Sequence, residues 1–136
     1  RRYELVFKKE NLTVIDDFAH HPTELKSTLT TAKNSGYDKV VAIFQPHTYT
    51  RTKALLDDFA AVLSMADKVI LLPIYPAREE DIYNISSADL AAKIKNSLLA
   101  KDIEDAAELA KKEIEGKTVI LTIGAGDVYK VWDYLK

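Results

Sequence analysis

Side chains capable of chemistry gather at three places in the sequence, each directly after an apolar run. In chain order they are Asp16, Asp17, His20 and His21; Gln45, His47, Thr48, Tyr49 and Arg51; and Gly124, Gly126 and Asp127. All three histidines of the chain belong to these groups. Imidazole, carboxylate and guanidinium groups bind and orient charged ligands, and loops after parallel strands meet at one sheet edge. We therefore predict a single binding face.

Arg51 is the most informative of these residues because it stands near the start of a predicted helix. A cation there opposes the helix dipole, whereas an anionic ligand at that end would be held by the guanidinium and by free N–H groups. An ion pair with a nearby aspartate is the structural alternative. We favour an anion-binding role for Arg51.

The other polar residues have simpler alternatives. Asp16 and Asp17 fit turn or capping positions, although Asp17 stands where the strand reaches the sheet edge. Phe18 is as consistent with packing as with ligand stacking, and so is Tyr49. His20 and His21 are adjacent, point in different directions and lack carboxylates at diagnostic spacing, so we predict no metal site.

Two glycine-containing strings resemble nucleotide-binding loops only in part. Residues 116–118 read GKT, but Lys111 occupies the place of the first glycine and a strand follows, which indicates a turn. Residues 124–126 read GAG, but Tyr129 replaces the third glycine of a dinucleotide fingerprint. The string still predicts a close approach of backbone to another group, not an NAD site.

Composition limits the class of protein. The chain has 136 residues, 47% hydrophobic and 29% charged, with net charge −2 and no cysteine. These values suit one globular domain and exclude disorder, and no apolar run is long enough to span a bilayer. Without a block of like charge we expect no nucleic-acid partner, and without a secretory signal we expect a cytoplasmic location.

The periodicity alternates between strand and helix. Residues 3–8, 12–17, 39–44, 67–72 and 117–123 read as strands, the last three covered on both faces. Helical patterns begin at Pro22, near Leu55, near Ser86 or Ser87 (running to Leu98), at Ile103 (ending at Gly116) and at Asp127. We predict an α/β fold, a Rossmann-like three-layer sandwich with a mostly parallel sheet of about five to six strands. The irregular residues 73–86 form a candidate functional loop.

Four strings match a known family in order and spacing. They are DDFAHHPTE at 16–24, FQPHTYTRT at 44–52, YPARE at 75–79 and GAGD at 124–127, preceded by RRYE at 1–4. Over essentially the whole chain they resemble the C-terminal domain of the Mur ligases. The double histidine resembles the MurC-like branch, which includes murein peptide ligase, and QPH with TRT favours the UDP-N-acetylmuramate:L-alanine ligases.

The resemblance implies a three-domain enzyme of peptidoglycan precursor synthesis. Such a ligase uses ATP and Mg²⁺ to phosphorylate the lactyl carboxylate of UDP-N-acetylmuramate, and the amine of L-alanine attacks the acyl phosphate. Residues 1–136 would be the amino-acid-binding domain that closes over the nucleotide and packs on the central domain. They would be a fragment without the UDP-binding and central ATPase domains, and inactive alone. Because the first residues resemble the junction between domains, we expect this sequence to be a piece excised from a longer chain.

The same resemblance assigns roles to single residues. Arg2 would reach the phosphate region and Asp17 would bind the ATP ribose, while Arg51 and His20 would hold the L-alanine carboxylate. Phe18 and Thr48 would line the amino-acid site. Many relatives have Tyr at the first of these two positions and Arg at the second, so a hydroxyl and a cation are missing here. Arg51 must then carry more of the carboxylate binding.

Two other classes compete. An acidic pair ending a core strand also suggests a receiver-like phosphoacceptor domain, but Gln45 and Gly124 stand where that class has Asp and Lys. A stand-alone nucleotide-binding module would bind ATP measurably, whereas a domain that holds only the ribose edge would not.

Overall fold

A six-stranded sheet forms the centre of the computed structural model, which describes residues 2–136 and so leaves Arg1 of the opening string outside the described residues. The strand order is β1-β2-β6-β3-β4-β5. Five strands are parallel, and β1 pairs antiparallel with β2 at one edge. The strands are β1 (Glu4–Lys9), β2 (Leu12–Asp17), β3 (Lys39–Phe44), β4 (Lys68–Leu71), β5 (Ser97–Leu99) and β6 (Thr118–Ile123).

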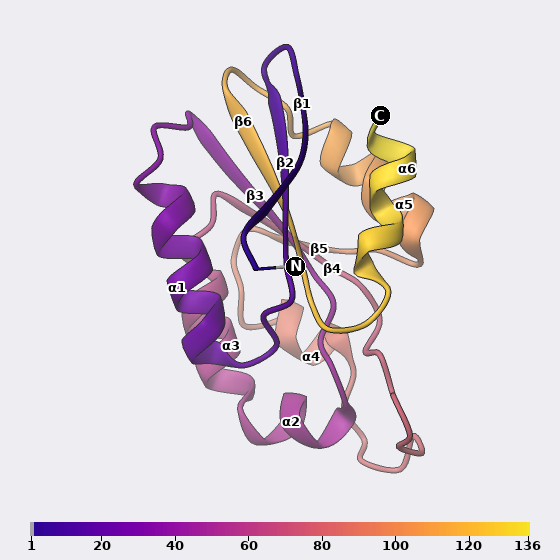
Figure 1. Cartoon of the computed structure of the whole chain (residues 1–136). Helices are drawn as coiled ribbons and strands as arrows, with labels where there is room; N and C mark the ends of the chain where they lie inside the picture. The colour runs from indigo at the N-terminus through magenta and orange to yellow at the C-terminus, as the bar shows by residue number, and fades with distance from the viewer. Residues whose placement is uncertain (1) are drawn as a thin grey trace.

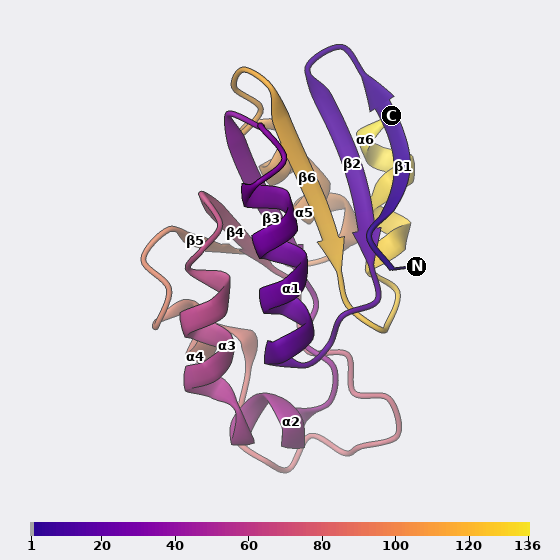
Figure 2. The same cartoon turned by 60° about the vertical axis from the view of Figure 1, so that its left-hand side comes forward.

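Helices cover both faces of this sheet, which confirms the predicted three-layer sandwich. In Figures 1 and 2, α1 and α3 lie side by side on one face, and α5 and α6 lie on the other. The helices are α1 (Pro22–Lys33), α2 (Tyr49–Ala54), α3 (Leu56–Leu63), α4 (Ser87–Ala91), α5 (Ile103–Lys111), the 3₁₀ helix η1 (Val128–Val131) and α6 (Trp132–Leu135). Within residues 2–136, no helix is long and apolar enough to cross a membrane.

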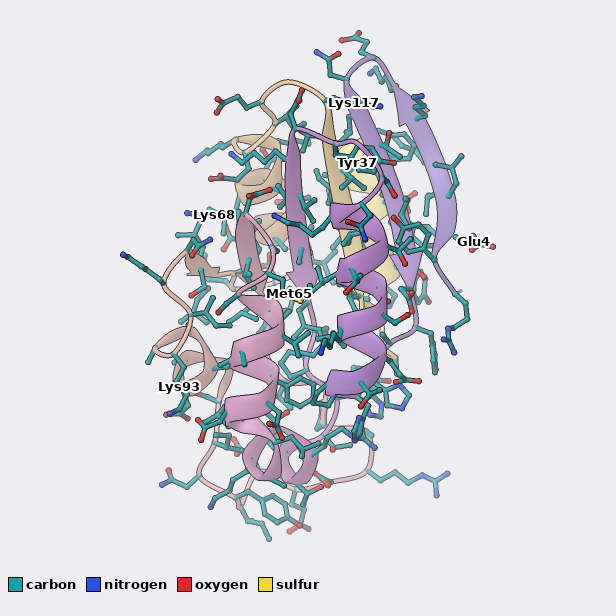
Figure 3. The ribbon with its side chains drawn as sticks, turned by 90° about the vertical axis from the view of Figure 1, so that its left-hand side faces the viewer. Glu4, Tyr37, Met65, Lys68, Lys93 and Lys117 are labelled. Carbon is teal, nitrogen blue, oxygen red and sulfur yellow. The ribbon has the colours of Figure 1, made fainter. Side chains whose placement is uncertain are left out.

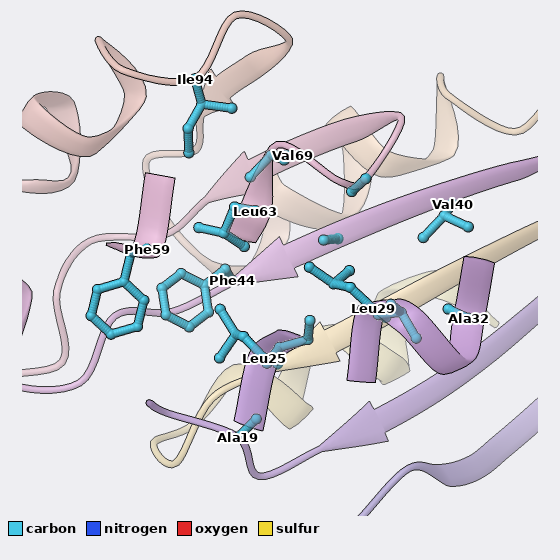
Figure 4. Packing of buried hydrophobic residues seen from close by; sticks show 14 of the residues in the cluster. Ala19, Leu25, Leu29, Ala32, Val40, Phe44, Phe59, Leu63, Val69 and Ile94 are labelled. Atoms are coloured by element: carbon cyan, nitrogen blue, oxygen red, sulfur yellow. The ribbon is translucent and has the colours of Figure 1, made fainter. Parts of the chain in front are cut away.

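Alternate residues of each central strand enter two separate cores. Phe44 and its strand neighbours at every second position pack toward α1 and α3, while Ile43 packs toward α5 and α6. Figure 4 shows Phe44 facing Phe59 of α3, with ring centroids 5.5 Å apart. Burial on both faces explains why these strands read as unbroken apolar runs.

The register of the parallel strands brings the predicted binding groups together. Ile123 at the end of β6 is the Cα partner of both Asp17 in β2 and Phe44 in β3. The backbone N–H of Gly124 donates to the Asp17 carbonyl at 3.0 Å, and that of Gln45 to the Ile123 carbonyl at 3.0 Å. The three polar groups therefore start from neighbouring strand ends, as predicted.

Turns connect the elements at the opposite edge of the sheet. Gly116 adopts a φ of +65° in the bend ahead of β6, so the GKT string is the turn that the sequence predicts. The ammonium of the next residue, Lys117, lies 5.5 Å from the centroid of the Tyr37 ring, and both are visible in Figure 3.

The helical predictions need three corrections. Leu98 lies in β5 rather than in a helix, because the third helix ends at Ala91 and three residues pair with β4. The helix predicted near Leu55 is α3, but a separate short helix, α2, precedes it, because Leu55 at φ −116° breaks the two. The fourth helix ends at Lys111, well before the predicted Gly116.

Candidate functional site

Four aromatic rings form a row along the carboxyl edge of the sheet. Phe18 and His20 follow β2, His47 follows β3, and Tyr75 follows β4. Ring centroids are 5.6 Å apart between Phe18 and His20, 5.9 Å between His20 and His47, and 5.5 Å between His47 and Tyr75, where the rings stack at 16°. Loops from three strands thus build one surface, which we call the ring row.

Arg51 joins the ring row through His47. Its Nη1 lies 3.3 Å from His47 Nδ1 and donates to the His47 carbonyl oxygen at 3.2 Å. A guanidinium only donates, so His47 Nδ1 must be the acceptor and the imidazole neutral. Burial, followed by the charges of Arg51 and His20, holds the pKa of His47 below its usual value. The geometry and the electrostatics therefore agree on a neutral His47.

His20 is oriented by the loop that carries it. Its Nδ1 lies 3.1 Å from the Phe18 carbonyl oxygen, so that nitrogen carries the proton and the other is left for a ligand. The backbone N–H of His20 donates to Glu24 Oε1 at 3.2 Å and keeps the pKa of that carboxyl below its usual range. The charge of Arg2, which is exposed, acts on Glu24 in the same direction.

Asp17 has most of its acceptor capacity in use. It is 4% exposed, and Oδ2 accepts from the Tyr3 N–H at 3.1 Å and from the Thr28 hydroxyl at 2.7 Å. Oδ1 accepts from the Ala19 N–H at 2.9 Å. A carboxylate offers about four acceptor positions, so one remains. Asp17 is therefore a structural anchor with room for one further donor.

The N-terminus of α2 differs from the sequence-based expectation. Its first N–H groups are not free for a ligand, because Glu79 Oε1 accepts from Tyr49 N at 2.6 Å and from Thr50 N at 3.1 Å. The anion that the helix dipole favours is thus an internal carboxylate, and Arg51 extends toward His47 instead. A ligand carboxylate at this site would depend on the guanidinium and not on the helix start.

Thr48 begins α2 in an unusual conformation. Its φ is +69° and ψ is 146°, a region that β-branched residues avoid. The side-chain oxygen accepts from Arg51 N at 3.3 Å, and the Thr48 N–H donates to the Tyr75 carbonyl at 2.8 Å. Thr48 therefore shapes the turn that carries Arg51.

Gly126 allows the ring row to pack closely on the loop after β6. A Cβ there would lie 2.5 Å from Gln45 Oε1 and 2.7 Å from the Tyr75 ring. Gln45 is itself held by Asp127, whose Oδ1 accepts from Nε2 at 2.6 Å. The close backbone approach predicted from the GAG string is therefore an approach to Gln45 and Tyr75.

The structure brings together four of the predicted site residues: Phe18, His20, Thr48 and Arg51. Asp17 and Arg2 lie at the neighbouring end of β2. Tyr75 and Glu79 were missed as site residues, although YPARE contains them, and His47 was placed on the binding face without a specific role. Across residues 2–136, no three His, Asp or Glu side chains are grouped so as to hold a metal ion.

Comparison with known proteins decides the family. The model of the family described as "Mur ligase, glutamate ligase domain" matches residues 1–126. The chain belongs to the Mur ligase family. A curated UDP-N-acetylmuramate–L-alanine ligase of Caldanaerobacter subterraneus subsp. tengcongensis is 48% identical over 135 residues, covering 96% of this chain and 29% of the relative.

Solved Mur ligases have the same fold. UDP-N-acetylmuramate-alanine ligase MurC from Thermotoga maritima is 29% identical, with a TM-score of 0.76. The match covers 99% of this chain and 29% of the Thermotoga chain. A murein peptide ligase from Psychrobacter arcticus is 25% identical with a TM-score of 0.75 and the same two coverages. This Mur ligase domain thus spans about three-tenths of the length of these relatives, and corresponds to their C-terminal domain. Family membership excludes the receiver-like alternative.

Proposed function

We propose that this domain binds L-alanine for an ATP-dependent ligase that joins it to UDP-N-acetylmuramate in peptidoglycan precursor synthesis. The observation that carries the proposal is the half-buried guanidinium of Arg51 beside His20 and the neutral His47. None of the ion pairs within the described residues involves Arg51. Its remaining donors match a carboxylate.

The proposed mechanism assigns this chain a positioning role. Arg51 binds the carboxylate of L-alanine, His20 offers its second ring nitrogen to the same ligand, and Phe18 and Thr48 limit the space around it. Held in this way, the amine is directed at its electrophile without a loss of freedom in the reaction step. When ATP is bound, it supplies the phosphoryl group that activates the acid.

The nucleotide assignments rest on fewer contacts. Asp17 retains one acceptor position for a ribose hydroxyl, and the exposed Arg2 offers a cation nearby. Neither group supports ATP binding alone, so we propose that the phosphates and Mg²⁺ are held by a central domain, in the cytoplasm, on which this face packs. The 136-residue chain with ATP, L-alanine and the UDP-sugar should accordingly show no ATP turnover.

Substitution of Arg51 tests the proposal. In a full-length ligase that contains this domain, Arg51→Ala should raise the KM for L-alanine about ten- to hundredfold, the cost of charge-assisted hydrogen bonds. Lys53→Ala is the matched control, because among the described residues the Lys53 ammonium, on the same helix, bonds only the Tyr83 carbonyl, at 2.8 Å. An unchanged KM for L-alanine in Arg51→Ala would refute the assignment.

A murein peptide ligase remains the second candidate, because its solved structure shares the fold. The 48% identity to an L-alanine ligase favours the single amino acid. Offering the full-length enzyme L-alanine or a muropeptide-type tripeptide separates the two, and turnover with the tripeptide alone would replace our proposal.

A further inference from the structure

Besides the contacts of Tyr83 with Tyr49 and Lys53, the loop at residues 73–86 contacts the Arg51 segment at two points near the start of α2. At the first, the Tyr75 ring stacks on His47 and its backbone pairs with the segment on both sides. Tyr75 N donates to the Pro46 carbonyl at 2.8 Å, and the Tyr75 carbonyl accepts from Thr48 N at 2.8 Å. This contact fixes the chain just before α2.

At the second point, Glu79 caps α2. One carboxylate oxygen accepts the backbone N–H groups of Tyr49 and Thr50, and the other accepts the Thr50 hydroxyl. Hydrogen bonding from that hydroxyl, more than the charge of Arg51, keeps the pKa of Glu79 below its usual range. The cap is therefore ionised at neutral pH.

The helix that receives this cap depends on outside support. α2 has six residues, which is too short for a helix to be stable by itself. Its N-cap, Thr48, has a strained backbone that persists only when its surroundings hold it. The Thr52 hydroxyl bonds the Thr48 carbonyl at 2.7 Å from within the helix, and Glu79 holds the next two residues from outside.

We propose that Glu79 is a positioning residue, which sets the N-terminus of α2 and thereby aims the Arg51 guanidinium at the amino-acid carboxylate. This inference rests on the proposed function. Glu79 acts through the backbone: no ion pair joins it to Arg51 within residues 2–136. A carboxylate in direct contact with the ligand would repel it, whereas one bound to the helix start leaves the guanidinium available.

Two substitutions separate the contributions of Glu79. Glu79→Ala removes every acceptor, and Glu79→Gln keeps one oxygen for the Tyr49 and Thr50 N–H groups. Glu80→Ala is the matched control, because Glu80 is the exposed neighbour and, within residues 2–136, only its backbone carbonyl makes a hydrogen bond, to Ile82 N. Each variant is made in the full-length ligase, together with Arg51→Ala.

The kinetic readout is the KM for L-alanine against kcat and the KM for ATP. We expect Glu79→Ala to raise the KM for L-alanine about five- to thirtyfold, in line with the loss of a helix cap. Glu79→Gln should restore most of this loss, and the KM for ATP should stay within about twofold in both variants. Equal rises in the KM for L-alanine and the KM for ATP would indicate general destabilisation and overturn the proposal. An equal loss of kcat in Glu79→Gln and Glu79→Ala would do the same.

A structural readout does not depend on catalysis. In the 136-residue chain, amide hydrogen exchange of Tyr49 and Thr50 should become faster in Glu79→Ala and remain slow in Glu80→Ala. Unchanged exchange would overturn the positioning role. If Arg51→Ala raises the KM for L-alanine but Glu79→Ala does not, the positioning role fails and the proposed function stands. If Arg51→Ala also has no effect, the proposed function fails and this inference fails with it.

Discussion

The carboxylate of Asp17 accepts the backbone N–H of Tyr3 at 3.1 Å, so the end of β2 holds the start of the described chain. The same carboxylate bonds Thr28 in the middle of α1 and Ala19 in the following loop. One residue thus ties the N-terminal segment, a helix and the ring row together. A nucleotide bound at the last acceptor position of Asp17 would therefore contact the residue that connects these three parts.

Asp17→Asn should therefore destabilise the domain. An amide has one oxygen and cannot accept all three donors, so at least one buried N–H or O–H loses its partner, at a cost of about 1–3 kcal/mol. Urea unfolding of the purified chain measures this loss. Asp133→Asn is the control, since its exposed ion pair to Lys136 contributes little. Equal stability of the two variants would contradict the anchoring role.

Gly126→Ala tests the close packing of the ring row on the loop after β6. The added methyl would meet Gln45 Oε1 and the Tyr75 ring at distances that real Cβ atoms do not adopt, so the loops must shift. We expect a loss of about 1–3 kcal/mol in the free energy of unfolding. Gly36→Asn serves as the control, because nothing lies within 4 Å of that site and Asn tolerates its φ of +84°. A fully stable Gly126→Ala would show that the loops yield freely.

A buried hydrogen-bond chain joins α6 to the sheet. Trp132 Nε1 donates to the Thr122 hydroxyl at 2.9 Å, which donates to Asp16 Oδ1 at 2.7 Å. Thr122→Val removes both bonds at nearly constant volume, and we expect it to cost about 1–3 kcal/mol. The hydrogen bond lost in Trp132→Phe should lower the free energy of unfolding less than the two lost in Thr122→Val, since Thr122 keeps its bond to Asp16. Chemical denaturation of both, with Thr30→Val on the exposed face of α1 as reference, checks the order.

The lowered pKa of His47 predicts a pH dependence of stability. Because the folded state binds this proton less readily than the unfolded state, unfolding takes up a proton as the pH falls. The contribution is complete above the ordinary histidine pKa of about 6.5 and is lost as the pH falls toward the lower folded value. The urea concentration at the unfolding midpoint should thus decrease as the pH is lowered from 7.5 to 5.5. This decrease should be less steep in His47→Asn.

The exposed Thr30, which does not titrate, provides the reference for this measurement. Thr30→Val should keep the wild-type slope over the same range. Glu24 and Glu79, whose pKa values are also lowered, lose their contributions only at more acidic pH, below about 4.5. Identical slopes in His47→Asn and the wild type would mean that His47 is not held neutral by folding.

Most of the fold followed from local pattern. Strands β3 and β6 end where their apolar runs end, because burial on both faces requires continuous apolar residues. β5 could not be predicted, since a three-residue strand has no periodicity of its own and exists through pairing with β4. Leu98 has the spacing of a helical residue by coincidence, but its pairing with Ile70 of β4 places it in a strand.

The residues alone were enough to place the polar groups at one sheet edge, to identify the Mur ligase family and to single out Arg51, because strand ends, sequence strings and helix starts are local features. Which donor meets which acceptor was settled only by folding. Glu79 caps a helix start 30 residues before it, and Asp17 binds a backbone N–H 14 residues before it. The neutral state of His47 likewise comes from burial and from the guanidinium beside it. Distances between loops that leave different strands are set by the register of the sheet, and no local pattern records them.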